Sequence, residues 1–130
     1  MATSKTKKAT GKRITHLQGA PKRQFERICR VALKLPGVEI STSYGTPALK
    51  ANGKLMGRLR TEAEGALALK CDFFDREILL QADPQAFFLI DHYLNYPMIL
   101  VRLDKVRPDA VPDLLQRAWK MATRKSMRGS

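Results

Sequence analysis

The fold of this chain depends on residues 41–60, which read STSYGTPALKANGKLMGRLR. Asn52-Gly53 lies between two short runs of alternating character, and this dipeptide in such a setting is the strongest short-range signal for a β-hairpin. Gly53 adopts the left-handed backbone of a tight turn without steric cost. The stretch therefore predicts two antiparallel strands that meet at Asn52-Gly53.

The length of the hairpin loop decides which side chains face the core. A two-residue loop would place Leu49 and Leu55 on opposite faces, so each face would mix apolar and charged side chains. A three-residue loop over residues 51–53 would bring both leucines to one face, at the cost of Lys50 opposite Lys54. Because a slip of one residue moves every side chain to the other face, burial favours the segregated register. We therefore predict the three-residue loop.

In this predicted register the hairpin has an apolar face and a basic face. The apolar face carries Leu49, Leu55, Gly57 and Leu59, and the basic face carries Lys50, Lys54, Met56, Arg58 and Arg60. A third strand over residues 67–71 alternates in the same way, so Lys70 joins the basic face when its leucines face the core.

The chain has 130 residues, of which 44% are hydrophobic, as expected of one globular domain with a real core. No apolar run approaches the roughly 20 residues of a membrane-spanning helix, and no signal-peptide apolar region follows the start. Cys29 and Cys71 are far apart and form no CxxC motif. We interpret them as reduced, buried thiols of a cytoplasmic protein.

The net charge of +12 is concentrated at the two ends of the chain. Residues 1–23 carry seven basic side chains, residues 117–130 carry five, and neither segment contains an acid, so the part between them is neutral. We predict a flexible basic arm over residues 1–20, an α+β domain over residues 21–125 and a frayed C-terminus over residues 126–130. Basic arms of this kind bind nucleic acid or anionic surfaces.

Periodicity and turn residues predict the other elements. We expect a helix from Pro21 to a stop at Pro36-Gly37, an extended piece over residues 38–40, a polar loop over residues 41–47, a helix over residues 72–82, a short strand over residues 87–90, a loop over residues 91–97, a strand over residues 98–104 and a helix that opens at Pro108. This order fits an antiparallel sheet with helices on one face. We therefore predict a two-layer α+β fold whose N- and C-terminal helices share that face.

All three predicted helices carry an apolar stripe. In the helix from Pro21 the stripe is Phe25, Ile28, Cys29, Ala32 and Leu35. In the helix over residues 72–82, with Asp72 as its N-cap, the stripe is Phe74, Ile78 and Ala82. In the last helix the stripe is Val111, Leu114, Leu115, Ala118, Trp119 and Ala122. Pro112 cannot donate to the carbonyl of Pro108, so we expect a distorted first turn there.

Several segments together resemble the MmcQ/YjbR-like family of small bacterial domains. The resemblance covers residues 24–125 and rests on LPGVEISTSYGTPALKANGKLMGRL, LALKCD, ADPQAFFLIDHYLNYPMILVRL and DLLQRAWKMATRK. It implies an antiparallel sheet carrying helices, similar to frataxin-like folds, and the double-wing DNA-binding motif proposed for the family. Frataxin-like iron binding is not carried over, because the helices of this chain lack an acidic ridge.

The sequence offers few groups for catalysis or metal binding. Of its two histidines, His16 lies in the predicted arm, and we interpret His92 as a structural hydrogen-bonding residue rather than a general base. The chain has no HExxH or paired CxxC, and the glycines of GKLMG belong to the hairpin rather than to a phosphate loop. We assign no catalytic residue, no metal ligand and no cofactor.

The basic face leads to our first functional hypothesis, binding of duplex DNA with low sequence specificity by an accessory protein. The candidate contacts are Lys50, Lys54, Arg58, Arg60, Lys70 and Arg102. Basic side chains hold phosphates whatever the sequence, and the arms add affinity. No helix-turn-helix, RRM or zinc-finger pattern supports base-specific reading. The alternative interpretation of these residues is a solvated sheet face.

The polar and aromatic loops lead to a second hypothesis, a small-ligand-binding protein or an enzyme of unknown substrate. The candidate pocket residues are Ser43, Tyr44, Thr46, His92, Tyr93 and Tyr96. If these residues converge at one end of the sheet, they form a ligand pocket. The alternative is that the tyrosine rings pack on the core with their hydroxyls in water. A protein-interaction module is a third possibility, for which the sequence offers no specific evidence.

Overall fold

A computed structural model describes residues 19–43, 46–60 and 65–124 of the chain. Within these residues, six strands form one antiparallel sheet in the order β1-β2-β3-β4-β6-β5. The strands are β1 (Val38–Ser43), β2 (Thr46–Ala51), β3 (Lys54–Leu59), β4 (Ala66–Lys70), β5 (Phe87–Phe88) and β6 (Met98–Arg102). The helices are α2 (Gly19–Ala32), α3 (Phe73–Ala82) and α4 (Val111–Thr123), with the 3-10 helices η1 (Asp91–Tyr93) and η2 (Pro108–Ala110).

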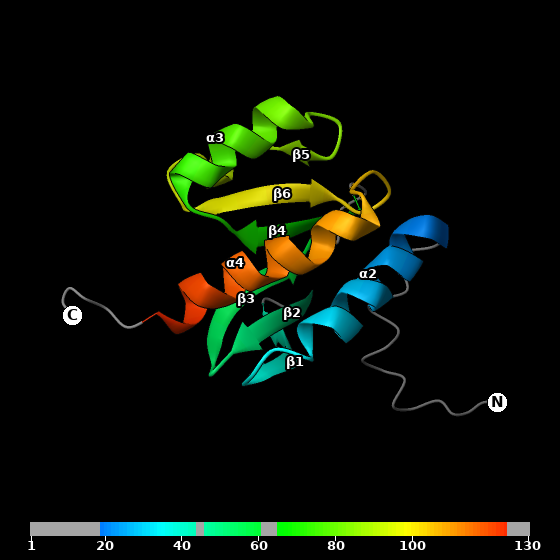
Figure 1. The fold of residues 1–130 in the computed structure, drawn as a ribbon, viewed down its shortest axis with the longest axis vertical. Coiled ribbons are helices and arrows are strands. Elements are labelled where there is room, and N and C mark those ends of the chain that lie inside the picture. The colour runs from blue at the N-terminus through cyan, green and yellow to red at the C-terminus, as the bar shows by residue number, and fades with distance from the viewer. Residues whose placement is uncertain (1–18, 44–45, 61–64, 125–130) are drawn as a thin grey trace.

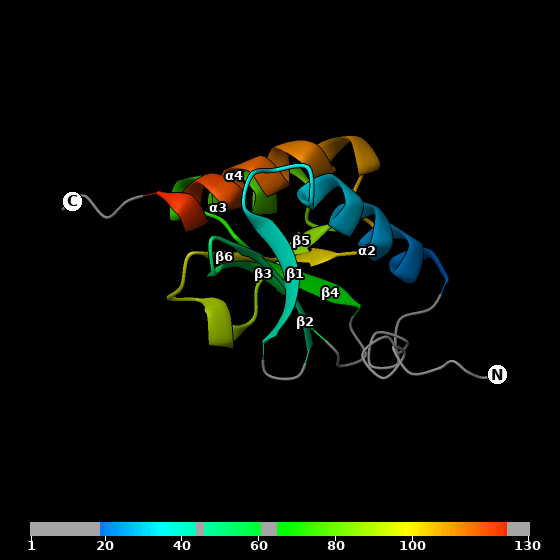
Figure 2. The same ribbon diagram turned by 90° about the horizontal axis from the view of Figure 1, so that it is seen from below.

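The three α-helices lie on one side of the sheet, and η1 lies on the other (Figures 1 and 2). This arrangement confirms the predicted α+β fold, with α2 and α4 on one face. Of the predicted basic arm, residues 19 and 20 begin α2 and residues 1–18 lie outside the described residues, as does the predicted C-terminus over residues 126–130. Among the described helices, none is both long and apolar enough to cross a membrane.

The central hairpin turns through a two-residue loop, so the predicted three-residue loop is wrong. Ala51 pairs directly with Lys54. The residues between them, Asn52 and Gly53, have φ angles of 53° and 82°. Positive φ at both positions is the type I′ geometry whose twist matches that of the flanking strands. The preference of the turn residues therefore sets the loop length, against the burial pattern that favoured a longer loop.

A β-bulge in β3 separates the apolar from the basic side chains. On β2, Lys50 pairs with Leu55. The neighbouring Leu49 already pairs with Gly57, so Met56 is an extra residue in the ladder. Met56 and Leu49 are consequently both buried on the helix side, whereas Leu55 lies with Lys50 on the other side. The predicted faces of Leu55 and Met56 are thus exchanged.

The extended piece predicted over residues 38–40 is longer, because residues 41–43 continue β1, which forms a hairpin with β2 from Thr46 onward. The expected polar loop over residues 41–47 is therefore mostly strand. Pro47 pairs with Thr42 of β1, but the ladder between β2 and β3 begins only at Ala48. A proline is tolerated at this position because it lies beyond the end of the second ladder, where no donor is required.

The apolar stripe of α4 packs on the sheet as predicted. Its buried residues are Val111, Leu114, Leu115, Ala118 and Ala122, which share the main core with Phe25 and Ile28 of α2 and with Leu49, Leu59, Leu67 and Ile99 of the sheet. Trp119 is half-buried, and its Nε1 donates to the carbonyl of Pro36 at 2.8 Å, which joins α4 to the turn after α2. The expected distortion at the start is also present, since Pro108–Ala110 is a 3-10 turn.

α3 presents to the core the face opposite to the one predicted. The predicted stripe is exposed, with Phe74 at 75% and Ile78 at 51% of their full exposure and Ala82 also exposed. Arg76 is only 5% exposed. Leu79 and Leu80, three and four residues further on, pack against the main core on the same helical face. This face is buried because Arg76 finds carbonyl acceptors there, as described below.

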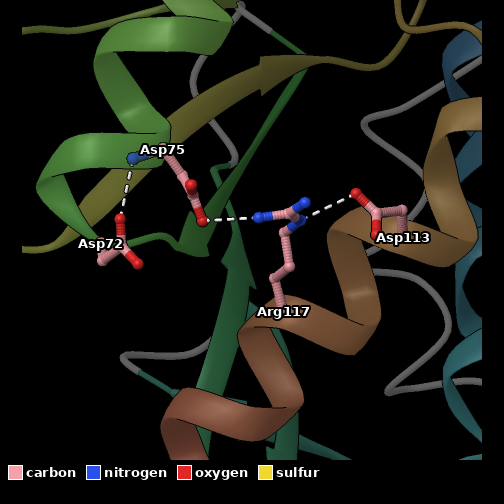
Figure 3. Close-up of polar contacts among 4 residues, drawn as sticks. All are labelled: Asp72, Asp75, Asp113 and Arg117. Carbon is pink, nitrogen blue, oxygen red and sulfur yellow. Dashed lines mark hydrogen bonds and ion pairs between the residues drawn. The ribbon is translucent and has the colours of Figure 1, made fainter.

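Polar contacts hold the first turn of α3 and join it to α4 (Figure 3). Asp72 is the N-cap, as predicted, and its Oδ1 accepts from the backbone N–H of Asp75 at 2.8 Å. The Asp75 carboxylate accepts from Nη1 of Arg117 at 2.7 Å, and Nε of the same arginine donates to Asp113 at 2.8 Å. Arg117 is half-exposed, so these ion pairs orient α3 more than they stabilise it.

Neither cysteine is part of a disulfide among the described residues. Cys71 is buried, as predicted, and Cys29 is half-buried. Burial raises the pKa of each thiol to about 11. Both thiols are therefore protonated at neutral pH, which leaves them without the thiolate that nucleophilic chemistry needs.

Candidate functional site

Five of the six predicted phosphate contacts share one face of the sheet, on the side away from α4. In the ladders, Arg58 pairs with Ala68 and Lys70 pairs with Met98. Both partners belong to a small apolar cluster that is separate from the main core. Strand alternation places the other three cations on the same side. We call this surface the basic face, and it consists of Lys50, Arg58, Arg60, Lys70 and Arg102.

Lys54, the sixth predicted contact, does not lie on the basic face. It pairs with Ala51, which is fully buried in the main core on the helix side. Directly paired residues project to the same side of a sheet. The exposed Lys54 therefore lies at the tip of the hairpin on the helix side, a consequence of the two-residue loop. This placement makes Lys54 a matched control for the lysines of the basic face.

The segment over residues 89–97 packs on the same side of the sheet as the basic face. η1 begins within it and appears in Figure 2 as a yellow-green coil below the sheet, opposite the three α-helices. Tyr93 of this segment is buried against Ala66, Ala68 and Leu100 of β4 and β6. The segment therefore forms a wall beside the cations rather than leaving the whole face flat.

Arg76 holds this wall in place from α3. Its Nη1 donates to the carbonyls of Tyr93 at 3.2 Å, Tyr96 at 2.8 Å and Met98 at 3.2 Å. Its Nη2 donates to the carbonyl of Leu94 at 3.0 Å. Charge-assisted hydrogen bonds to carbonyls inside a protein are strong, and the planar guanidinium fixes their directions. Arg76 is thus a positioning residue for the segment over residues 89–97.

A cavity of about 610 Å³ lies between this wall and the basic face. Arg58 and Lys70 contribute its cations. Its aromatic side is His92, Tyr93 and Tyr96, and its apolar lining is Leu55, Pro97 and Met98. A volume of 300–1,000 Å³, approximately, with an apolar lining and a few convergent polar groups, is usual for small-ligand sites. The cavity therefore joins residues from both predicted sites in one place.

The rings at the edge of the cavity are ordered by contacts with each other. The His92 and Tyr93 rings pack edge to face, with centroids 4.8 Å apart and an interplanar angle of 82°. The Tyr96 ring lies 6.3 Å from that of His92 at an angle of 40°. Tyr96 is 57% exposed, so much of its ring is open to a ligand. Exposed aromatic faces beside cations suit a flat, anionic molecule.

Two other cations of the basic face lie over aromatic rings. The Arg102 guanidinium lies 4.0 Å from the centroid of Phe88, and its Nη1 donates to the carbonyl of Gln85 at 3.1 Å. The Arg60 guanidinium lies 5.8 Å from the centroid of Tyr93. These cation–π contacts restrain where each guanidinium can reach.

The second predicted site is only partly assembled within the described residues. His92, Tyr93 and Tyr96 converge at the cavity, whereas Thr46 is buried at the start of β2. Tyr44 lies outside the described residues, and the side chain of Ser43 does too.

The sequence interpretation missed Arg76, Leu55 and Met98. The signal for Arg76 was its spacing from Leu79 and Leu80, which offered a second apolar face for α3.

No group of three or more histidine, cysteine, aspartate or glutamate side chains that could hold a metal ion occurs in the described part of the chain. The cavity itself offers two cations and three aromatic side chains. These groups bind anions and stack on flat rings.

Comparison with known proteins agrees with the fold. The family model for YjbR matches residues 33–121, which include all the strands from β1 to β6 and most of α4. The crystal structure of Deinococcus radiodurans protein DR2400, with the family-model domain DUF419, superposes with a TM-score of 0.66. The two sequences are 21% identical, and the match covers 78% of this chain and 79% of that one. At this identity the likeness concerns the fold. No significant match was found among curated proteins.

Proposed function

We propose that this chain, which belongs to the YjbR family, binds nucleic acid by placing the cations of its basic face against phosphates. The observation that carries the proposal is the shared side of Lys50, Arg58 and Lys70, which come from three adjacent strands. Arg58 pairs with Ala48 and Ala68, which are two residues away from Lys50 and Lys70 on their strands, so the three cations form a triangle on this side of the sheet. Such a cluster of cations matches the negative charge of a phosphate backbone.

Low sequence specificity follows from the shape of this surface. The basic face is a sheet with a wall on one side, and the three described α-helices lie on the opposite side, where they cannot accompany it into a major groove. Phosphate contacts position a nucleic acid without reading its bases. The basic segments at the two ends of the chain add charge that favours any polyanion. Duplex DNA is therefore an expected partner, bound with little preference for sequence.

Fluorescence anisotropy with a labelled 20-base-pair duplex at several salt concentrations tests this proposal. Five phosphate contacts predict that log K falls with log salt with a slope of about −4.5. The decisive variant reverses two lysines of the basic face, Lys50→Glu with Lys70→Glu, and we expect its Kd to rise by about tenfold or more at low salt. Lys34→Glu with Lys54→Glu is the matched control, because it makes the same charge change away from the basic face, at the turn after α2 and at the hairpin tip on the helix side.

Two results would count against the basic face. If the wild-type chain fails to bind at micromolar concentration and low salt, the proposal is wrong. If both double variants weaken binding equally, only total charge matters. A full-length variant with Lys5, Lys7, Lys8, Lys12 and Arg13 changed to Gln then measures the share of the N-terminal segment. Thermal melting curves verify that every variant is folded.

A second candidate function is favoured by the cavity beside the basic face. A site of about 610 Å³ with two cations and an aromatic edge is suited to a small ligand. Thermal-shift screening with metabolites tests this candidate, because a ligand that binds the folded state raises the melting temperature by mass action. An increase that disappears in Tyr96→Ala would place the ligand in the cavity.

A further inference from the structure

We propose that the cavity binds one nucleotide unit that is not stacked in a duplex, with its base on the Tyr96 and His92 rings and its phosphate at Lys70 and Arg58. If the nucleotide is part of a nucleic acid strand, the inference rests on the proposed function. The same chemistry is offered by a free mononucleotide. The two sources are separated by the experiments below.

The aromatic half of the site is suited to a base. Tyr96 is 57% exposed, and its ring is tilted by 40° relative to that of His92 at a centroid distance of 6.3 Å. The backbone under these rings is held by Arg76, which donates to the carbonyls of Tyr93, Leu94 and Tyr96. The rings therefore have a fixed support and an open face. Stacking on such rings tolerates every base, because every base has a π face.

The cationic half of the site is suited to a phosphate. Lys70 and Arg58 line the same cavity as the rings and come from the neighbouring strands β4 and β3. Lys70 is half-buried, and no ion-pair partner for it occurs within residues 19–43, 46–60 and 65–124. A lysine ammonium and a guanidinium on adjacent strands can together hold the oxygens of one phosphate.

The apolar lining completes the fit of the cavity to a nucleotide. Leu55 and Met98 line the cavity together with the rings and the cations. A ligand that uses the whole lining has an anionic end, a flat aromatic end and some less polar surface. Inorganic phosphate has only the first of these, and a nucleoside has only the second.

The shape of the site excludes a base that remains inside a duplex. Bases in a duplex stack on each other, so their faces are not available to a protein ring unless they are extruded. An unpaired strand offers both its base faces and its phosphates. The cavity therefore predicts that single strands bind more tightly than duplexes of equal length. The basic face alone predicts no such preference.

Isothermal titration of the full chain with AMP, adenosine and inorganic phosphate tests the site without any strand. We expect AMP to bind at least about tenfold more tightly than either of the other two, because only AMP occupies both halves of the cavity. Tyr96→Ala should weaken AMP binding by about tenfold and leave phosphate binding unchanged. Phe74→Ala is the matched control, since it removes an exposed aromatic ring from α3, on the other side of the sheet.

The strand experiment uses a labelled 12-nucleotide single strand and the corresponding 12-base-pair duplex. Tyr96→Ala should weaken single-strand binding by about tenfold and duplex binding by less than about twofold. Lys70→Gln should weaken both, since both contain phosphates. If Tyr96→Ala and wild type bind the single strand equally, the inference for a strand is overturned while the proposed function stands.

The combined outcomes distinguish the failure of each proposal. AMP binding that requires Tyr96, without binding of either nucleic acid, supports a free-nucleotide site and overturns nucleic-acid binding. If the chain binds the duplex but neither binds AMP nor prefers the single strand, the proposed function is supported and the nucleotide site is overturned. If AMP binds no more tightly than phosphate and no strand preference appears, the cavity does not bind a nucleotide.

Discussion

α4 and α3 both lie on the helix side of the sheet, yet they are held there by different forces. α4 buries a row of five aliphatic side chains in the main core. α3 buries an arginine and leaves Phe74 and Ile78 in solvent. Leu79 and Leu80 pack against the main core, and polar contacts add to this: the Asp72 cap, the bridge through Arg117 (Figure 3) and the hydrogen bonds of Arg76.

The difference between the two helices shows when an apolar stripe in the sequence correctly predicts the buried face of a helix. α4 contacts β2, β3 and β4 in the middle of the sheet, so a large apolar surface faces its stripe. The main contacts of α3 with the sheet are to β5 and β6, at the edge. At an edge, little apolar surface is available, and a cation with four carbonyl acceptors decides which face turns inward. We expect the following substitutions to differ in size for this reason.

The largest loss should come from Leu115→Ala in α4. Leu115 is 1% exposed in the main core, and truncation of a buried leucine removes its burial energy and leaves a cavity. We expect a loss of about 4 kcal/mol in the free energy of unfolding, measured by urea denaturation. Lys120→Ala, on the exposed side of the same helix, should change it by less than about 0.5 kcal/mol. A loss below about 1 kcal/mol for Leu115→Ala would contradict the packing of α4.

A slightly smaller loss is expected from Arg76→Met in α3. The methionine fills part of the space but removes the charge-assisted hydrogen bonds to the carbonyls of Tyr93, Leu94, Tyr96 and Met98. We expect a loss of about 3 kcal/mol in the free energy of unfolding. Arg76→Lys keeps the positive charge but lacks the planar guanidinium. Its free energy of unfolding should lie between those of wild type and Arg76→Met. If Arg76→Met is as stable as wild type, Arg76 does not hold the wall.

The N-cap of α3 should contribute less than its buried arginine. Asp72→Ala removes the acceptor for the Asp75 N–H and should lower the free energy of unfolding by about 1 kcal/mol. Asp72→Asn is the matched control, because asparagine is an equally good N-cap. Equal losses in both variants would indicate that the negative charge of Asp72, rather than the cap, stabilises α3.

The smallest effect is expected from Phe74→Ser, on the exposed face of α3. Because Phe74 is 75% exposed, its replacement should change the free energy of unfolding by less than about 0.5 kcal/mol. Under the face predicted from the sequence, the same change would remove a buried aromatic ring and cost about 3 kcal/mol or more. Chemical denaturation therefore decides between the two orientations of α3.

Much of the fold was predictable because its strands and its last helix have clear periods. The alternation in β4 and β6 and the stripe of α4 placed their side chains on the correct faces. The errors lie where two local signals disagreed. In the hairpin, burial favoured a three-residue loop and Asn52-Gly53 favoured two residues, and a bulge at Met56 allowed the turn preference to prevail without a loss of burial.

The candidate site was predictable in its parts but not as a whole. The cations Arg58 and Lys70 and the rings of His92 and Tyr96 were identified as two separate candidate sites. They form one cavity because residues 89–97 fold onto the basic face, where Arg76 holds their carbonyls. That contact joins positions that are 17 to 22 residues apart in the sequence, and no local period signals it.

The sequence by itself determined the α+β class, the basic character of one sheet face and the burial of α4, because each of these depends on the local spacing of apolar residues. The tertiary structure alone decided the register of the central hairpin, the orientation of α3 and the union of cations and rings in one cavity. These features depend on contacts between residues that are far apart in the sequence: those of the hairpin strands with their neighbours, of the buried arginine with its carbonyls, and of residues 89–97 with the sheet. Local periodicity contains no information about those partners.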